Sequence, residues 1–345
     1  MSRTTDRTLW ITRCPVPTAT GLALGQGWLQ AALHSLGWSV ETLQEARNAD
    51  LRLAHFRHDL KGLVREGGNI PPLWARADGA DTVVVGLTWV DERQAVLARP
   101  DAGIVTPADL KGRRLGVVRT ADPSTDFSRA MSLHGFASAL RLAGLTLADV
   151  EIVEFAQPES RGWGGPPPSN GAQDALLAGE VDVIYAKGAQ GAYLEQRHEL
   201  KLVIDLNTHP DPKVRINNGT PRPITFHRDF LAANYDIVVR YLSVVLQAAD
   251  WAQTHGDKTR EVLARETGTD LASVLLGYGP ELNRSLGVNL SAERIEALEI
   301  QKNFLRDNDL IPADFSVADW VDARPLAAAA ALVAAGKAPI PAGAA

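Results

Sequence analysis

"PADLKGRRLGVV" (residues 107–118) and "LLAGEVDVIY" (residues 176–185) are the two stretches that decide the fold. In the first, a proline-started acidic turn leads through Gly112 into an apolar strand at Leu115–Val118. In the second, a short helix ends at Gly179, the residue type that most often closes a helix, and a strand follows at Val181–Tyr185. A helix or turn placed directly before each strand is typical of an α/β protein with a mainly parallel sheet.

The same alternation precedes these stretches. "RTLWITR" (7–13) is predicted to be a strand that Pro15 and Pro17 end. Thr18 or Thr20 then caps a predicted helix that carries apolar residues as far as Leu33. "GWSVETL" (37–43) and "DTVVVGLTWV" (81–90) are predicted as further strands, the latter apolar enough to be buried on both faces.

The remaining segments continue the pattern and then become helical. We predict a helix over residues 124–143, strands at "DVEIVEF" (149–155) and "LKLVIDL" (200–206), and a surface loop over 157–171, which is rich in Gly and Pro. From residue 229 the pattern is mostly helical, with one helix capped by Ser291. The Ala- and Pro-rich end, 326–345, is predicted to be a weakly ordered tail.

Composition excludes several classes of protein. The 345 residues are too many for one ordinary core and suit two lobes, and 45% hydrophobic with 22% charged residues is typical of a soluble globular protein. The net charge of −6, without a dense basic stretch, argues against a nucleic-acid partner. No apolar run approaches the length of a membrane span. The N-terminal "MSRTTDRTLWITRCPVP" lacks an apolar export segment, so we expect a cytoplasmic protein. We also expect a monomer.

The order and spacing of the two opening stretches resemble those of type II periplasmic binding proteins. That resemblance implies two α/β lobes, each a mainly parallel sheet flanked by helices, with the chain crossing between them twice. We therefore expect lobe I to comprise residues 1–97 and 205–325, and lobe II residues 98–204.

Three shorter motifs carry a narrower resemblance. "CPVP" (14–17), "HF" (55–56) and "R-x-GG-x-IPPL" (65–73) are similar to motifs of the 2′-hydroxybiphenyl-2-sulfinate desulfinase family, cytosolic enzymes built on the binding-protein fold. The resemblance implies that Cys14, His55 and Arg65 are catalytic. It places the substrate beside a set of four residues: Thr12, Gly67, Gly68 and Trp74. The sequence departs from the family at Glu66, where an aromatic residue is expected, and in the shorter stretch 120–132, and both departures are expected at the substrate pocket.

The chemistry of a sulfinate accounts for these residue types. Arg65 offers a planar fork of N–H donors to two oxygens, and "GGNIPPLW" (67–74) offers backbone N–H groups at a predicted helix start. The helix start at Thr18–Thr20 is expected to lower the pKa of Cys14. Cys14 could act as a general acid toward the ring carbon or as a nucleophile toward sulfur, with His55 orienting or re-protonating it. No metal and no organic cofactor is expected.

Plainer interpretations stay open. A lone cysteine is more often a small buried apolar residue, and His55 could be an ordinary hydrogen-bonded histidine. His55 and His58 have the spacing of a metal pair but lack a third ligand nearby, so we reject a metal site. Tryptophans 28, 38, 74 and 89 are more often core than pocket lining. A non-catalytic solute-binding protein for a sulfonate, sulfinate or similar anion is the alternative function, and a cofactor-free hydrolase of another carbon–sulfur bond is a third.

Overall fold

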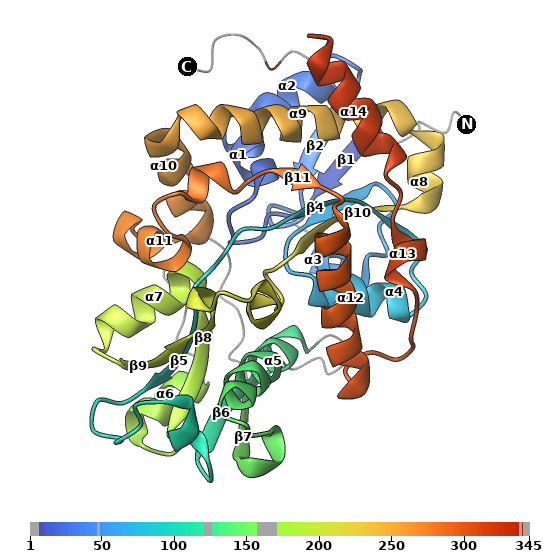
Figure 1. The fold of residues 1–345 in the computed structure, drawn as a ribbon. Helices are drawn as coiled ribbons and strands as arrows, with labels where there is room; N and C mark the ends of the chain where they lie inside the picture. The colour runs from blue at the N-terminus through green and yellow to red at the C-terminus, as the bar shows by residue number, and fades with distance from the viewer. Residues whose placement is uncertain (1–6, 47–48, 121–125, 157–170, 338–339, 341–345) are drawn as a thin grey trace.

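A computed structural model describes residues 7–46, 49–120, 126–156, 171–337 and 340. Two sheets, each flanked by helices, build two lobes, and the chain passes between them twice (Figure 1). The predicted two-lobed α/β fold is confirmed. In the described part of the chain, no helix has the length and apolar character needed to cross a bilayer.

The sheet of lobe I has six strands in the order β11-β4-β10-β3-β1-β2. Their bounds are β1 Thr8–Ile11, β2 Ser39–Thr42, β3 Leu63–Glu66, β4 Thr82–Thr88, β10 Arg222–His227 and β11 Val288–Asn289. Strand β1 runs parallel to β2 and β3, whereas β10 runs antiparallel to both β3 and β4. All seven residues of β4 are buried, as its largely apolar sequence, "TVVVGLT", predicts.

The sheet of lobe II has five strands in the order β7-β6-β8-β5-β9. Their bounds are β5 Gln94–Ala98, β6 Arg114–Arg119, β7 Glu151–Ala156, β8 Val183–Lys187 and β9 Lys201–Asp205. Strand β6 is parallel to β7 and β8, and β5 is antiparallel to β8 and β9. The chain therefore enters the second sheet at Gln94, a few residues before the boundary expected from the sequence, because β5 pairs with strands of lobe II.

Fourteen α-helices lie in the described ranges. They are α1 Ala19–Gly25, α2 Trp28–His34, α3 Ala49–Arg57, α4 Ile70–Ala77, α5 Phe127–Leu142, α6 Gly171–Ala178, α7 Gly188–Arg197, α8 Arg228–Ala233, α9 Tyr235–Thr254, α10 Gly256–Thr267, α11 Leu271–Tyr278, α12 Ala292–Asp307, α13 Val317–Trp320 and α14 Arg324–Ala334. The single helix predicted up to Leu33 is instead two, because Gly27 has a φ of 73° and interrupts the helix. The predicted cap at Ser291 is confirmed, since its side chain accepts a hydrogen bond from Arg294 N.

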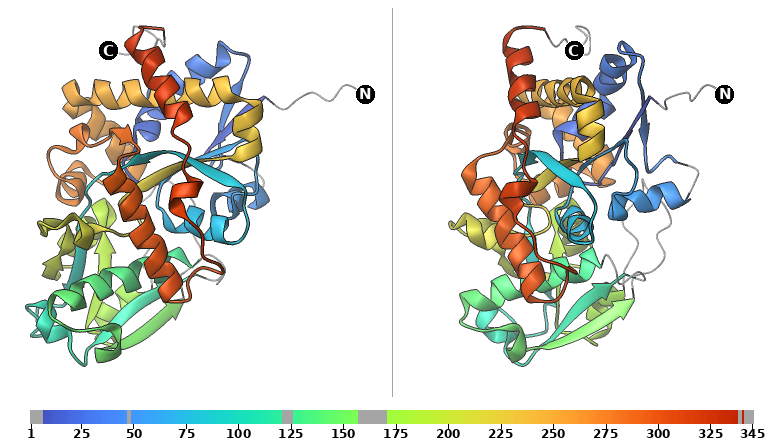
Figure 2. Two further views of the ribbon diagram at one scale, coloured as in Figure 1. Left: turned by 45° about the vertical axis from the view of Figure 1, so that its right-hand side comes forward. Right: turned by 90° about the vertical axis from the view of Figure 1, so that its right-hand side faces the viewer.

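Helix α12 connects the two lobes. It runs from the six-stranded sheet down to α5, which covers the sheet of lobe II (Figures 1 and 2). There the ring of His134 stacks on Phe304 at 4.0 Å, and His134 Nδ1 lies 2.9 Å from Gln301 Oε1. The inter-lobe contact is thus made by side chains as well as by the first crossing segment, residues 89–93, and the second crossing segment, residues 206–221.

The C-terminal prediction needs correction. Residues 326–334 belong to α14, which packs against α9, and Leu326 and Ala329 are buried in the largest apolar core. Alanine has the highest helix propensity, so the Ala-rich sequence favours a helix that the apolar face of α9 then holds. Residues 338–339 and 341–345 lie outside the described residues, as do 157–170 of the predicted surface loop.

Candidate active site

Cys14 lies in the loop that joins β1 to α1. Its side chain is half-buried and its Sγ packs against Gly67, just past the end of β3. A methyl group added at Gly67 would lie 2.4 Å from Cys14 Sγ, far inside van der Waals contact. Glycine at position 67 therefore lets the loop bring the thiol against the end of β3.

Arg65 is a buried cation held by carbonyl groups. Its side chain is only 1% exposed; Nε donates to His55 O at 3.1 Å and Nη1 donates to Gly68 O at 2.7 Å. These bonds use two of the five guanidinium N–H donors, and no carboxylate forms an ion pair with Arg65 among the described residues. Burial lowers the pKa of Arg65 to about 10, so the group remains a cation at neutral pH.

His55 lies on α3, where its carbonyl oxygen accepts the hydrogen bond from Arg65 Nε. Its Nδ1 is buried and has no hydrogen-bond partner among the described residues. Burial, followed by the charges of Arg65 and His58, holds the pKa of His55 well below its ordinary value, so the imidazole is neutral. Cys14 and His55 thus both neighbour Arg65, although no described hydrogen bond joins the two.

His58 has a separate role. It is fully buried, its Nε2 lies 2.9 Å from Thr225 Oγ1, and its carbonyl oxygen accepts a hydrogen bond from His227. His58 is therefore committed to β10 and does not pair with His55. Within the described residues, no group of three or more His, Cys, Asp or Glu side chains has the arrangement of a metal site.

The electrostatic prediction for Cys14 is wrong in sign. Burial raises the pKa of Cys14 and outweighs the opposing charges of Arg65, Arg222 and Lys187, with Glu66 adding to the rise. Two N–H groups at the start of α1 are already hydrogen-bonded to side chains of the protein. Thr18 Oγ1 accepts from Gly21 N at 2.9 Å, and Glu66 Oε2 accepts from Thr20 N at 3.3 Å. Cys14 is thus a neutral thiol at neutral pH, which suits a proton donor.

The predicted helix start after the two glycines is present as α4, with Pro71 and Pro72 in its first turn. The backbone N–H of Ile70, the first residue of α4, is not available to an anion, because it donates to Asn218 Oδ1 at 3.0 Å. The Asn218 side chain also lies directly on Gly68, where an added methyl group would be 2.5 Å from its Oδ1. In this arrangement the second crossing segment fills the position expected for an anion at α4.

Two further predicted site residues have structural contacts. Thr12 Oγ1 donates to Glu66 O at 3.4 Å and accepts from Glu66 N at 3.3 Å, so it fastens the end of β1 to β3. Trp74 is partly buried and packs on the apolar cluster that contains Leu73 and Trp320. Trp28 and Trp38 lie in the main core, as the plainer interpretation expects.

Sequence reasoning missed three charged residues that connect lobe II to the Cys14 loop. Glu92, which is 1% exposed, accepts from Lys187 Nζ at 3.0 Å through Oε1 and from Arg222 Nη2 at 2.9 Å through Oε2. Arg222 Nη1 also reaches Pro17 O, in the Cys14 loop, at 3.4 Å. These residues stand in β10, in β8 and in the first crossing segment, and no local motif marks them.

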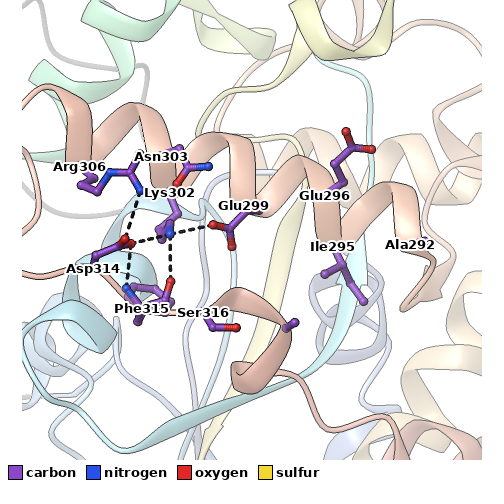
Figure 3. A pocket seen from close by; sticks show the side chains of 11 residues that line it. Ala292, Ile295, Glu296, Glu299, Lys302, Asn303, Arg306, Asp314, Phe315 and Ser316 are labelled. Atoms are coloured by element: carbon purple, nitrogen blue, oxygen red, sulfur yellow. Dashed lines mark hydrogen bonds and ion pairs between the residues drawn. The ribbon is translucent and has the colours of Figure 1, made fainter.

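A surface hollow between α12 and residues 314–318 does not suit an anion (Figure 3). Lys302 Nζ donates to Asp314 Oδ1 at 2.5 Å and pairs with Glu299 at 2.7 Å. Arg306 also pairs with Asp314, at 3.1 Å. Both cations lining the hollow are therefore neutralised, in contrast to Arg65.

The two-lobed fold, with Cys14 on a loop of lobe I beside Arg65 of β3, agrees with a match to a known protein family. Residues 72–259, more than half of the chain, match the NMT1/THI5-like family, and the chain belongs to that family. It is 26% identical over 347 residues to the 2′-hydroxybiphenyl-2-sulfinate desulfinase of Rhodococcus erythropolis, covering 91% of each chain. The resemblance inferred from the short motifs is thereby confirmed.

Solved structures give the same picture. The crystal structure of the desulfurization enzyme DszB superposes with a TM-score of 0.78 at 25% identity, covering 94% of this chain and 99% of that one. The periplasmic aliphatic sulphonate-binding protein SsuA from Escherichia coli shares the fold, with a TM-score of 0.67 at 17% identity over 92% of both chains. Enzymes and binding proteins thus both occur among the similar structures.

Proposed function

We propose that the protein is a cofactor-independent hydrolase that removes the sulfinate group from an aromatic sulfinate, releasing the arene and sulfite. The observation that carries the proposal is the buried Arg65, which carbonyl groups hold beside the sole thiol and which pairs with no carboxylate in the described part of the chain. An uncompensated buried cation is costly, and an anionic ligand would relieve that cost. The similarity to a desulfinase over 91% of the chain supports the choice of sulfinate.

In the proposed reaction Cys14 is the general acid. The thiol gives its proton to the ring carbon that bears sulfur, and the electrons of the breaking carbon–sulfur bond restore the aromatic ring while sulfur dioxide leaves. Water adds to sulfur dioxide to give bisulfite and a proton, which returns to the thiolate directly or through the neutral His55. The raised pKa of Cys14, caused mainly by burial, favours this route over attack by a thiolate.

The aryl group has candidate contacts where the lobes meet. Phe56, next to His55 on α3, stacks on Phe127 at the start of α5 with ring centroids 5.7 Å apart. Both rings are partly buried, one from each lobe. An aromatic substrate could replace this contact between the two phenyl rings with its own, since stacking is similar in energy for any flat ring.

We also propose that the protein acts in the cytoplasm.

The alternative is a solute-binding protein for a sulfonate or sulfinate. The likeness of the fold to SsuA supports it. It would use Arg65 in the same way but would have no need of Cys14.

Sulfite release tests the proposal. The substrates are 2′-hydroxybiphenyl-2-sulfinate and benzenesulfinate, offered to the wild type and to Cys14→Ser, with circular dichroism as the control for folding. We expect release by the wild type and a loss of about 10²–10⁴-fold in the variant, the usual contribution of a general acid. Tight binding without sulfite release, equal in both proteins, would favour the binding protein.

A further inference from the structure

The starting observation is a chain of charges that crosses from lobe II to the Cys14 loop. Lys187 is the last residue of β8, in lobe II, and immediately precedes α7. Its ammonium is 3.0 Å from Glu92, in the first crossing segment, and the other oxygen of Glu92 is 2.9 Å from Arg222, in lobe I. Arg222 in turn donates to Pro17 O in the Cys14 loop.

Glu92 has little freedom to move. An added methyl group at Gly219 would lie 1.7 Å from Glu92 Oε1, so the carboxylate rests directly on the second crossing segment. A further ion pair joins the two crossing segments, between Arg215 and Asp91 at 3.3 Å. Lys187 is also fixed by its backbone surroundings, because the next residue, Gly188, donates its N–H to Arg93 O at 2.8 Å.

The charges do not balance. One carboxylate, Glu92, faces the two cations Lys187 and Arg222, and Arg65 adds a third cation that no described carboxylate pairs. Glu66, an acid of β3 that also acts on Cys14, has its pKa raised mainly by burial. Even with Glu66 ionised, these three cations outnumber the two carboxylates. The surroundings of Cys14 are therefore positive, and lobe II supplies one of the three positive charges.

We propose that Lys187 is a positioning residue for the Cys14 loop: anchored on Glu92, it links lobe II through Arg222 to Pro17 O and so couples the surroundings of the thiol to the docking of the two lobes. Burial raises the pKa of Cys14, whereas Arg65, Arg222 and Lys187 each lower it. Without the Lys187 ammonium, one positive charge fewer opposes the rise in the pKa of Cys14 that burial causes. The thiol of a Lys187 variant then ionises at higher pH.

Among the described residues, four charged groups act on the pKa of Cys14. Arg65 and Glu66 come from β3, Arg222 from β10 and Lys187 from lobe II. The neighbouring Arg13 is committed to Glu266, with Nη2 and Oε1 at 2.5 Å. Of the facing cations, only Lys187 belongs to lobe II, so only its contribution tests the coupling between lobes.

The test uses the single thiol of the chain. The rate of alkylation of the full-length protein by iodoacetamide is measured from pH 6 to 11, where only Cys14 can react as a cysteine. For Lys187→Gln and Lys187→Met we expect the midpoint to move to higher pH and the rate below it to fall by roughly 3- to 10-fold, as loss of one nearby charge implies. Lys187→Arg should keep the wild-type midpoint. Lys201→Gln, a cation of β9 in the same lobe, is the matched control and should also keep it.

Two outcomes would overturn the proposal. One is an unchanged midpoint with an altered plateau rate at high pH, which would mean that Lys187 only controls access to the thiol. The other is an equal shift in Lys201→Gln, which would mean a general effect of net charge. The proposal rests on Cys14 being the working group of the proposed function, but alkylation needs no turnover. A shifted midpoint in a protein that releases no sulfite would therefore reject the hydrolase and keep the role of Lys187.

Discussion

Two buried arginines, Arg65 and Arg222, differ in whether a carboxylate compensates their positive charge. Arg222 is fully buried on β10 and pairs with the carboxylate of Glu92 at 2.9 Å. Arg65, on the neighbouring strand β3, is equally buried but donates only to the carbonyl oxygens of His55 and Gly68. The first arginine is neutralised by its own protein and the second is not.

The difference separates a structural cation from a binding cation. Removing one partner of a buried ion pair leaves the other charge uncompensated, which costs several kcal/mol. A buried cation without a carboxylate partner already carries this unfavourable free energy, and binding of an anionic ligand can offset it. We therefore expect stability to depend on Arg222 and ligand binding to depend on Arg65.

Arg222→Met should have the largest effect. It leaves Glu92 buried with Lys187 alone and should lower the free energy of unfolding by about 3–5 kcal/mol. Urea denaturation followed by circular dichroism measures it. A change below about 1 kcal/mol would remove the distinction between the two arginines.

Loss of ligand-induced stabilisation comes next. In a Cys14→Ser background, which prevents turnover, benzenesulfinate at 100 times its Kd should stabilise the protein by about 2.7 kcal/mol. Adding Arg65→Met should abolish that gain, because the anion loses its buried cation. Thermal unfolding with and without the ligand gives the answer, and an undiminished shift would mean that the sulfinate binds elsewhere.

Without ligand, Arg65→Met should alter stability little. The variant loses two hydrogen bonds to carbonyl oxygens but no longer buries an uncompensated charge. These contributions oppose each other, so the free energy of unfolding should change by about 1 kcal/mol or less. A destabilisation as large as that of Arg222→Met, measured in the same urea series, would contradict the comparison.

Glu66→Gln should show the smallest effect and a definite pH dependence. Burial raises the pKa of Glu66 in the folded state above its value near 4.3 in the unfolded chain. The stability that the protonated acid contributes is therefore complete below that value and is lost as the pH rises through the folded pKa. Unfolding curves should show the variant and the wild type equal near pH 4, with the variant increasingly the more stable at higher pH. The opposite trend would mean that the Glu66 carboxylate is stabilised by its surroundings.

The sequence predicts much of the neighbourhood of Arg65 and little of that of Arg222. Cys14, Arg65 and the two glycines fall in short motifs, and the prolines of α4 mark a helix start by their fixed φ. The sequence does not predict strand β3, "LVRE", because two charged residues in a run of four do not indicate a strand that is buried throughout. Burial of both charges is imposed by the tertiary fold, through His55, Gly68 and the start of α1.

The site residues that the sequence does not predict are held by contacts between residues far apart in the chain. Glu92 and Arg222 are 130 residues apart, and Glu92 and Lys187 are 95 apart, so no periodicity or spacing connects them. The same limit applies to Asn218, which reaches the start of α4 from the second crossing segment. Helix propensity alone, by contrast, would have favoured α14 in the Ala-rich end.

The strand order has a consequence for biosynthesis. The five strands of lobe II are contiguous in the chain, from Gln94 to Asp205, whereas β10 lies between β4 and β3 in the sheet of lobe I. Domains generally fold as units while the chain emerges from the ribosome. Lobe II can therefore be completed first, while β1 to β4 wait for a central strand that has not yet been translated. Cys14, in the loop after β1, is therefore translated before lobe II but acquires its surroundings only after β10 has been made.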